Sequence, residues 1–316
     1  MASPVDDSLE AGDPASRLCW AAVGGFAVAT VIAFRAAGLA FDLAGGWRVW
    51  LTIVVLCLVA WIYRRRGPAP RLSRGTEVGA QLLSIMLLTM MITFPLTVLS
   101  ASIPYRDDWL AAADLALGFD WRALNATVEA HPWLATAMML AYVTMVPQFA
   151  VVVVALAAAG RLRRLQHLVL SVALCLAVTL GIFAVMPALG YHGHLGLPNA
   201  PPFVALLQAL RSGAIGTTRL ETLDGLISFP SFHTAAALIL AWAFWDLRML
   251  RWPAIVLNLL VVASTPVMGS HYLVDLIAGA ALGTTAIAAA GRLLTTRSTP
   301  SQSSGPSGFA FGSKSK

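Results

Sequence analysis

The feature that most constrains this chain is a series of long apolar segments, each long enough to cross a lipid bilayer. Because lipid offers no hydrogen-bond partners to the backbone, such a segment crosses a membrane as a helix of roughly 20 residues. We expect eight of these helices, at residues 18–41, 47–63, 77–100, 132–159, 166–187, 231–250, 252–268 and 270–294. The sequence therefore predicts an all-α polytopic membrane protein with about eight transmembrane helices.

Composition supports this fold class and excludes others. Hydrophobic residues make up 58% of the 316 residues and charged residues 11%, whereas soluble domains average about 45–50% and about 25%. The net charge of +6 resides mostly in short loops between apolar segments, so we expect no nucleic-acid partner. The three cysteines lie singly within apolar segments, which argues against a disulfide framework or a zinc site.

The chain divides into four parts by composition. Residues 1–17 and 295–316 are polar and rich in Ser, Gly or Pro, so we expect two disordered cytoplasmic tails. Residues 18–76 hold two additional N-terminal transmembrane helices. Residues 77–294 hold the six-helix core in which we expect the functional site.

Loop charges predict the orientation of the helices. The loops at 64–74, 160–167 and 246–252 carry five, three and two arginines, and all three fall on one side if there are eight spans. The positive-inside rule places that side, and with it both termini, in the cytoplasm. Arginine-rich, Ala- and Gly-rich composition suggests a bacterial inner membrane. The side with few basic residues is then periplasmic or extracellular.

One ionisable pair has helical spacing near the outer end of the last helix. His271 and Asp275 are four residues apart, which places both on the same helix face. The Asp275 carboxylate can accept a hydrogen bond from one imidazole nitrogen and leave the other as an oriented nucleophile. A purely structural His–Asp pair at the helix end is the alternative interpretation.

A second signal lies at the outer start of the sixth expected helix. Residues 228–233 read SFPSFH, in which Pro230 and Ser231 are typical of a helix start whose free N–H groups bind anions. His233 would stand beside the bound anion, at the same membrane depth as His271 and Asp275. An interfacial histidine at a capped helix end is again the alternative.

Together these residues predict phosphoryl transfer through a phosphohistidine. His271 would attack phosphorus, Asp275 would orient it, and His233 would protonate the leaving oxygen. Two other function classes stay open. One is a metal-dependent membrane hydrolase with the same three residues as ligands, and the other is a non-enzymatic membrane transporter or scaffold.

These residues resemble the second and third motifs of the type 2 phosphatidic acid phosphatase superfamily. Pro230-Ser231-Phe232-His233 and His271-Tyr272-x-x-Asp275 are most similar to the branch with fungal inositol phosphorylceramide synthases, which has a bulky residue between Ser and His. The small residue Gly279 also fits that branch. The segment from Asp114 to Trp121 resembles bacterial members, and the resemblance covers residues 77–294.

The resemblance implies a fold, a substrate class and residue roles. It implies an enzyme without metal or cofactor that acts on lipid-linked phosphates and can transfer a phospho-headgroup to a lipid alcohol. His271 would be the nucleophile, Asp275 its orienting partner and His233 the general acid. Ser231 and nearby backbone N–H groups would hold the phosphate oxygens.

The sequence also departs from the superfamily. No lysine precedes Lys314, so the first motif, with its Lys and Arg-Pro, is missing, and Thr265 stands where the family has an arginine six residues before the nucleophilic histidine. Phosphate oxygens need positive or N–H partners. We expect substitutes among five outer-side residues: Arg106, Arg211, Arg219, His192 and His194.

Overall fold

The structure is a computed structural model that describes residues 14–42, 46–66, 69–219 and 225–296. Most residues of the two expected disordered tails lie outside these described residues. The longer helices are α1 (Pro14–Ala37), α2 (Trp47–Arg66), α3 (Pro70–Leu99), α6 (Pro132–Val143), α7 (Met145–Ala158), α8 (Leu162–Val185), α11 (Phe232–Phe244), α12 (Arg251–Met268) and α13 (Leu273–Thr296). Shorter elements are α4 (Asp107–Ala116), α5 (Trp121–Glu129), α9 (Gly190–His194), α10 (Pro202–Arg211), β1 (Ala40–Asp42) and β2 (Thr217–Arg219).

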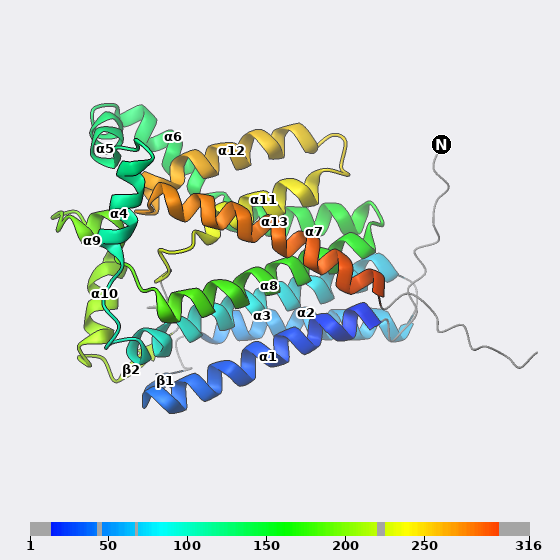
Figure 1. The fold of residues 1–316 in the computed structure, drawn as a ribbon. Coiled ribbons are helices and arrows are strands. Elements are labelled where there is room, and N and C mark those ends of the chain that lie inside the picture. Colours follow the sequence, from blue (N-terminus) through cyan, green and yellow to red (C-terminus); the bar gives the residue numbers. More distant parts are fainter. Residues whose placement is uncertain (1–13, 43–45, 67–68, 220–224, 297–316) are drawn as a thin grey trace, which may run out of the picture.

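The long helices confirm an all-α polytopic membrane protein. Within the described residues, six helices are long and apolar enough to cross a membrane, and α6 with α7 makes a seventh span if the pair counts as one. The long helices run side by side, and α4, α5, α9 and α10 gather at one end of the bundle (Figure 1). The two three-residue strands pair in parallel near that end.

Two of the expected helices differ from the sequence-based prediction. The segment 132–159 is bent by 45° where α6 gives way to α7, because Pro147 in the first turn of α7 has no N–H to donate to the preceding turn. The segment 231–250 is helical only to Phe244, or about 20 Å of helix. After it the chain turns, and Asp246 pairs with Arg164 of α8 at 2.6 Å.

A buried carboxylate holds the first two helices to the third. Glu77 of α3 is 2% exposed and lies 2.6 Å from Arg64 of α2 and 3.0 Å from Arg74. From α1, the Trp20 indole donates to Glu77 at 3.0 Å and the Ser16 hydroxyl donates to it as well. The two additional N-terminal helices are thus fixed to α3 by polar contacts at the arginine-rich end of the bundle.

Close packing of α11 against α13 positions the candidate site. A Cβ atom at Gly279 of α13 would collide with the Ser231 carbonyl oxygen, and one at Gly283 would lie 2.8 Å from the Ala235 oxygen. Glycine at both positions therefore permits the two backbones to touch. This close helix packing brings the starts of α11 and α13 together.

We predict that Gly279→Ala destabilises the protein by about 1–3 kcal/mol, because the added methyl group forces two packed backbones apart. Thermal unfolding in detergent measures the change. Gly181→Ala in α8 is the matched control, since nothing lies within 4 Å of a Cβ atom there and alanine favours helix. Equal losses of stability in both variants would contradict this account of the α11–α13 contact.

Candidate active site

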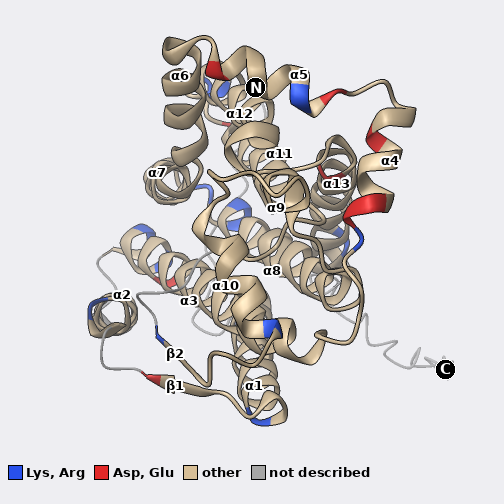
Figure 2. Ribbon diagram, turned by 90° about the vertical axis from the view of Figure 1, so that its left-hand side faces the viewer, with Lys and Arg blue, Asp and Glu red and all other residues tan. Residues whose placement is uncertain are grey.

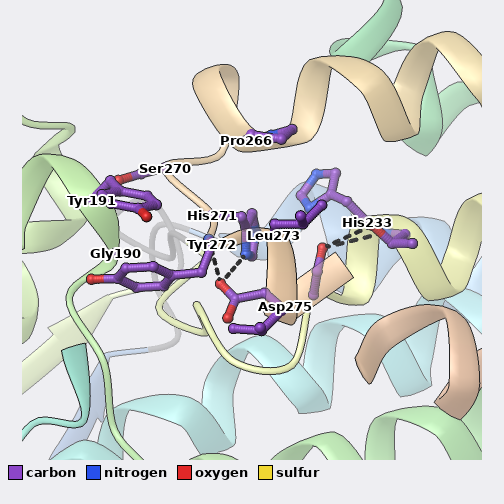
Figure 3. Close-up of polar contacts among 12 residues, drawn as sticks. Gly190, Tyr191, His233, Pro266, Ser270, His271, Tyr272, Leu273 and Asp275 are labelled. Carbon is purple, nitrogen blue, oxygen red and sulfur yellow. Dashed lines mark hydrogen bonds and ion pairs between the residues drawn. The ribbon is translucent and has the colours of Figure 1, made fainter. Parts of the chain in front are cut away.

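The His271–Asp275 pair is formed, but the expectation that both residues share a helix face is wrong: Asp275 lies in the first turn of α13, whereas His271 lies two residues before the helix begins. His271 Nδ1 lies 3.2 Å from Asp275 Oδ2, and the Tyr272 backbone N–H donates to the same oxygen at 2.9 Å (Figure 3). The two side chains are 4% and 0% exposed. Because Asp275 accepts at Nδ1, the Nε2 nitrogen of His271 is the one left to react.

His233 faces this pair from the first turn of α11. The ring centroids of His233 and His271 are 6.3 Å apart. Reacting atoms in a productive complex approach to about 3–3.5 Å, so a phosphorus-sized group between the rings can be reached by both imidazoles. The structure therefore brings together the three residues to which the sequence assigns chemistry.

Tyr142 is a further residue at this site that the sequence did not reveal. Its ring stacks on His233 with centroids 4.2 Å apart and an interplanar angle of 15°, and its hydroxyl lies 3.3 Å from His233 Nδ1. Gly269 makes room for it, since a Cβ atom there would lie 2.9 Å from the Tyr142 hydroxyl. Tyr142 lies 91 residues before His233, inside an apolar helix, so no spacing signal exists.

The start of α11 offers backbone donors beside His233. Ser231 is fully buried, its N–H donates to the Asp275 carbonyl at 3.1 Å, and its hydroxyl oxygen accepts from the Thr234 N–H at 3.3 Å. The Phe232 and His233 N–H groups have no hydrogen-bond partner among the described residues. Two unpaired N–H groups at a helix start suit a phosphate oxygen.

The start of α13 is closed by a buried carboxylate instead. Asp114 of α4 is 0% exposed and accepts from the Leu273 N–H at 2.7 Å and the Val274 N–H at 2.9 Å. The Tyr191 hydroxyl donates to it at 3.0 Å. Asp114 therefore caps the helix that carries Asp275. It is the first residue of the segment from Asp114 to Trp121 that resembles bacterial family members.

A second carboxylate on α4 holds the turn before α13. Asp107 is 3% exposed and accepts from the Tyr272 hydroxyl at 2.8 Å. It also accepts from the Leu189 and Gly190 N–H groups at 2.9 Å each. The acidic residues of α4 thus lie beside α13 and α9 (Figure 2), and they fix the residue next to His271.

The residue before His271, Ser270, is held to α9 by hydrogen bonds. Ser270 has a positive φ of 59°, its carbonyl accepts from the Tyr191 N–H at 3.0 Å, and its hydroxyl oxygen accepts from the His192 N–H at 2.9 Å. Gly190 has a φ of 76°, and a Cβ atom there would overlap the Ser270 carbonyl oxygen. The backbone on the N-terminal side of His271 is therefore fixed by hydrogen bonds from α9.

Trp121 covers the same turn from α5. Its indole N–H donates to the Pro266 carbonyl at 2.8 Å, and its ring stacks on Tyr191 with centroids 4.9 Å apart. Pro266 lies near the end of α12, where the last carbonyl groups of a helix have no N–H partner within the helix. The short helices α4 and α5 thus build one wall of the site.

Two of the expected phosphate-binding arginines have other partners. Arg211 donates to the Ser100 and Ala101 carbonyls at 3.0 Å each and lies over the Tyr105 ring at 4.2 Å. Burial raises the pKa of Tyr105, although the charge of Arg211 opposes this shift. Arg219 pairs with Asp42 at 3.2 Å, so both guanidinium groups support the chain near β1, β2 and α10.

The remaining candidates for phosphate binding differ in their exposure and in their partners. Arg106 is exposed just before α4. His194 lies 3.9 Å from Asp108 and is 23% exposed. His192 is 7% exposed, and its Nδ1 atom has no hydrogen-bond partner among the described residues. Thr265, which replaces the family arginine, is buried and donates to the Val261 carbonyl at 2.7 Å.

A metal site would need several His, Cys, Asp or Glu side chains to converge on one point. Within the described ranges, no group of three or more His, Cys, Asp or Glu side chains is arranged to hold one. His271 and Asp275 use their facing atoms on each other. The second imidazole, His233, contacts Tyr142.

We predict that Asp114→Asn destabilises the protein by about 1–3 kcal/mol, because the amide group cannot accept from all three donors that the carboxylate satisfies. Thermal unfolding of the purified protein measures this. Asp108→Asn on the same helix is the control, since its side chain is fully exposed. Unfolding temperatures that fall equally in both variants would contradict the capping role.

Comparison with known families gives one match. A sequence model of the PAP2 superfamily, the type 2 phosphatidic acid phosphatases, matches residues 108–289, more than half of the chain. Comparison with curated proteins and with solved structures gave no significant match. The matched segment begins in α4 and contains His233, His271 and Asp275, whereas α1, α2 and α3 precede it. The chain is therefore an integral membrane protein that belongs to the PAP2 superfamily.

Proposed function

We propose that the protein is a membrane phosphotransferase of the phosphatase type that acts on lipid-linked phosphates through a phosphohistidine at His271. Membership of the PAP2 superfamily supports a phosphatase-type enzyme. The observation that carries the proposal is the buried His271–Asp275 pair, which faces His233 across 6.3 Å.

The first step forms a bond between His271 and phosphorus. Asp275 accepts the Nδ1 proton of His271 in a hydrogen bond, so the Nε2 lone pair attacks the phosphorus atom. The bond from phosphorus to the ester oxygen breaks, and its electron pair stays on that oxygen. Protonated His233 supplies the proton that the leaving oxygen takes up.

The second step returns the enzyme to its starting state. The hydroxyl group of a lipid alcohol, or water, attacks phosphorus and gives its proton to His233. The phosphorus–nitrogen bond breaks, and its electron pair returns to His271. With a lipid alcohol the phospho-headgroup moves to a new lipid, and with water the product is a free phosphate compound.

The scarcity of cations favours transfer of a phospho-headgroup over hydrolysis of a phosphate monoester. A monoester carries about −1.5 to −2 charges at neutral pH, whereas a diester carries one. The site offers the Phe232 and His233 N–H groups, while Thr265 replaces the family arginine. These partners suit the single charge of a diester, as in the inositol phosphorylceramide synthase-like branch.

We further propose that the site opens on the outer membrane face and that both termini are cytoplasmic. His271 lies at the start of α13, and Gly291 lies about 30 Å further along that helix. There it approaches His167 of α8, three residues from Arg164 in the arginine-rich first turn of that helix. The positive-inside rule places that arginine-rich end in the cytoplasm.

A lipid assay with purified protein in detergent tests the proposal. Phosphatidic acid, isoprenyl pyrophosphate and phosphatidylinositol are supplied in EDTA, each with and without a ceramide or diacylglycerol acceptor, and products are read by mass spectrometry. We expect acceptor-dependent headgroup transfer that His271→Ala abolishes. Acceptor-independent phosphate release would instead make the protein a lipid phosphatase.

The same assay separates the other two function classes. Activity abolished by EDTA and restored by a divalent metal would replace the phosphohistidine proposal with a metal-dependent hydrolase. Folded protein without activity on any lipid, and without a phosphorylated His271 in its mass spectrum, would favour a transporter or scaffold. A phosphorylated His271 in acid-free digests would support the proposal directly.

We predict that the His233→Ala variant distinguishes substrates by their leaving groups. Removal of a general acid should lower turnover of a lipid phosphate by about 100-fold or more, because an alkoxide leaves poorly without a proton. An aryl phosphate with an acidic phenol needs no proton, so its hydrolysis should fall much less. Equal losses on both substrates would contradict the acid role of His233.

We predict that Tyr142→Phe lowers turnover of the lipid phosphate about tenfold, the worth of one hydrogen bond that orients an imidazole. The phenylalanine ring keeps the stack on His233, so stability should change little. As a positioning residue for the acid, Tyr142 should matter less for the aryl phosphate. A loss that is the same for both substrates would assign Tyr142 a structural role only.

A further inference from the structure

An apolar cavity lies between α3 and α7. Its volume is about 600 Å³, and α3 and α7 form most of its walls, with Leu56 of α2 on one side. Only two lining side chains are polar, Arg71 and Thr76, and both lie near the start of α3. The cavity is therefore apolar along its length and charged at one end.

The dimensions of this cavity match a lipid tail. Its lining extends along α3 from Arg71 to Met86, which is about 23 Å of helix. Half of the hydrocarbon core of a bilayer is about 15 Å thick. One acyl chain can therefore lie against α3 from the membrane surface to the middle of the bilayer.

Small side chains create the space. Gly75, Gly79, Ala150 and Ala157 line the cavity, and a Cβ atom at Gly79 would meet only Leu56, at 3.8 Å. Larger residues at these positions would fill the space between α3 and α7. The apolar walls would bind hydrocarbon and would not hold water.

Arg71 supplies charge at the mouth of the cavity. It is exposed, and its guanidinium group lies 3.5–3.7 Å from a Cβ position at Gly160, next to Arg161. Arg64 and Arg74 nearby both pair with Glu77, whereas Arg71 has no ion pair with any acid in the described part of the chain. An unpaired guanidinium at the end of an apolar cavity is complementary to a phosphate above an acyl chain.

We propose that this cavity is a binding site for an anionic phospholipid, with one acyl chain between α3 and α7 and the phosphate on Arg71. It belongs to the leaflet at the arginine-rich end of the bundle. The site at His271 lies at the opposite end, so the bound lipid is a ligand and not the substrate. The inference stands independently of the proposed function.

Native mass spectrometry of the full chain in detergent tests the charge at the mouth. Phosphatidylglycerol and phosphatidylcholine with identical acyl chains are added in equal amounts, and retained lipid is counted. We expect preferential retention of phosphatidylglycerol, and a preference reduced about tenfold in Arg71→Gln, which loses a charge-assisted contact. Arg163→Gln is the control, since Arg163 is exposed at the same end but does not line the cavity.

A second pair of variants tests the cavity itself. Ala150→Phe fills the space and should lower retention of both lipids, whereas Val151→Phe adds the same ring outside the cavity and should not. Circular dichroism and unfolding temperature establish that both variants fold. Equal retention of the two lipids by the unmodified protein, or full retention by folded Ala150→Phe, would overturn the proposal.

Discussion

The cap that Asp114 places on α13 is the contact on which the candidate site depends. A helix that starts inside a protein at membrane depth leaves N–H groups without water to bind them. Asp114 accepts from two of these groups and from the Tyr191 hydroxyl. The same carboxylate thereby joins α4, α9 and α13. His271 and Asp275 lie within one turn of this junction, so their geometry follows from it.

The two helix starts at the site have different partners and therefore different uses. Asp114 occupies the N–H groups of α13, so an anion finds no free donors there. The start of α11 keeps the Phe232 and His233 N–H groups unpaired among the described residues, and glycine at position 279 brings α13 against it. The turn before α13 thus carries the proposed nucleophile, and the start of α11 carries the proposed acid together with the donors for phosphate.

Most of the fold follows from hydrophobic patterning, because an apolar segment of about 20 residues has few alternatives in a membrane. The ends of the helices follow less well. Pro147 breaks the helix expected at 132–159, and that signal is visible in the sequence. At the early end of α11, Arg164 of α8 donates to the Trp242 and Ala243 carbonyls and pairs with Asp246. That contact joins residues 82 apart in the chain, so no local pattern predicts it.

The sequence by itself determined that the chain is a membrane protein, that His271 and Asp275 are close enough along the chain to pair, and that residue 231 precedes a helix start. Each of these follows from residues that are near one another in the sequence, although His271 lies before α13 and not on its face. Only the tertiary structure decided that Tyr142 stacks on His233, that Asp114 caps α13, and that Arg211 and Arg219 serve other contacts. These partners come from different helices, and which side chains meet across a bundle depends on helix packing, which the one-dimensional pattern does not specify.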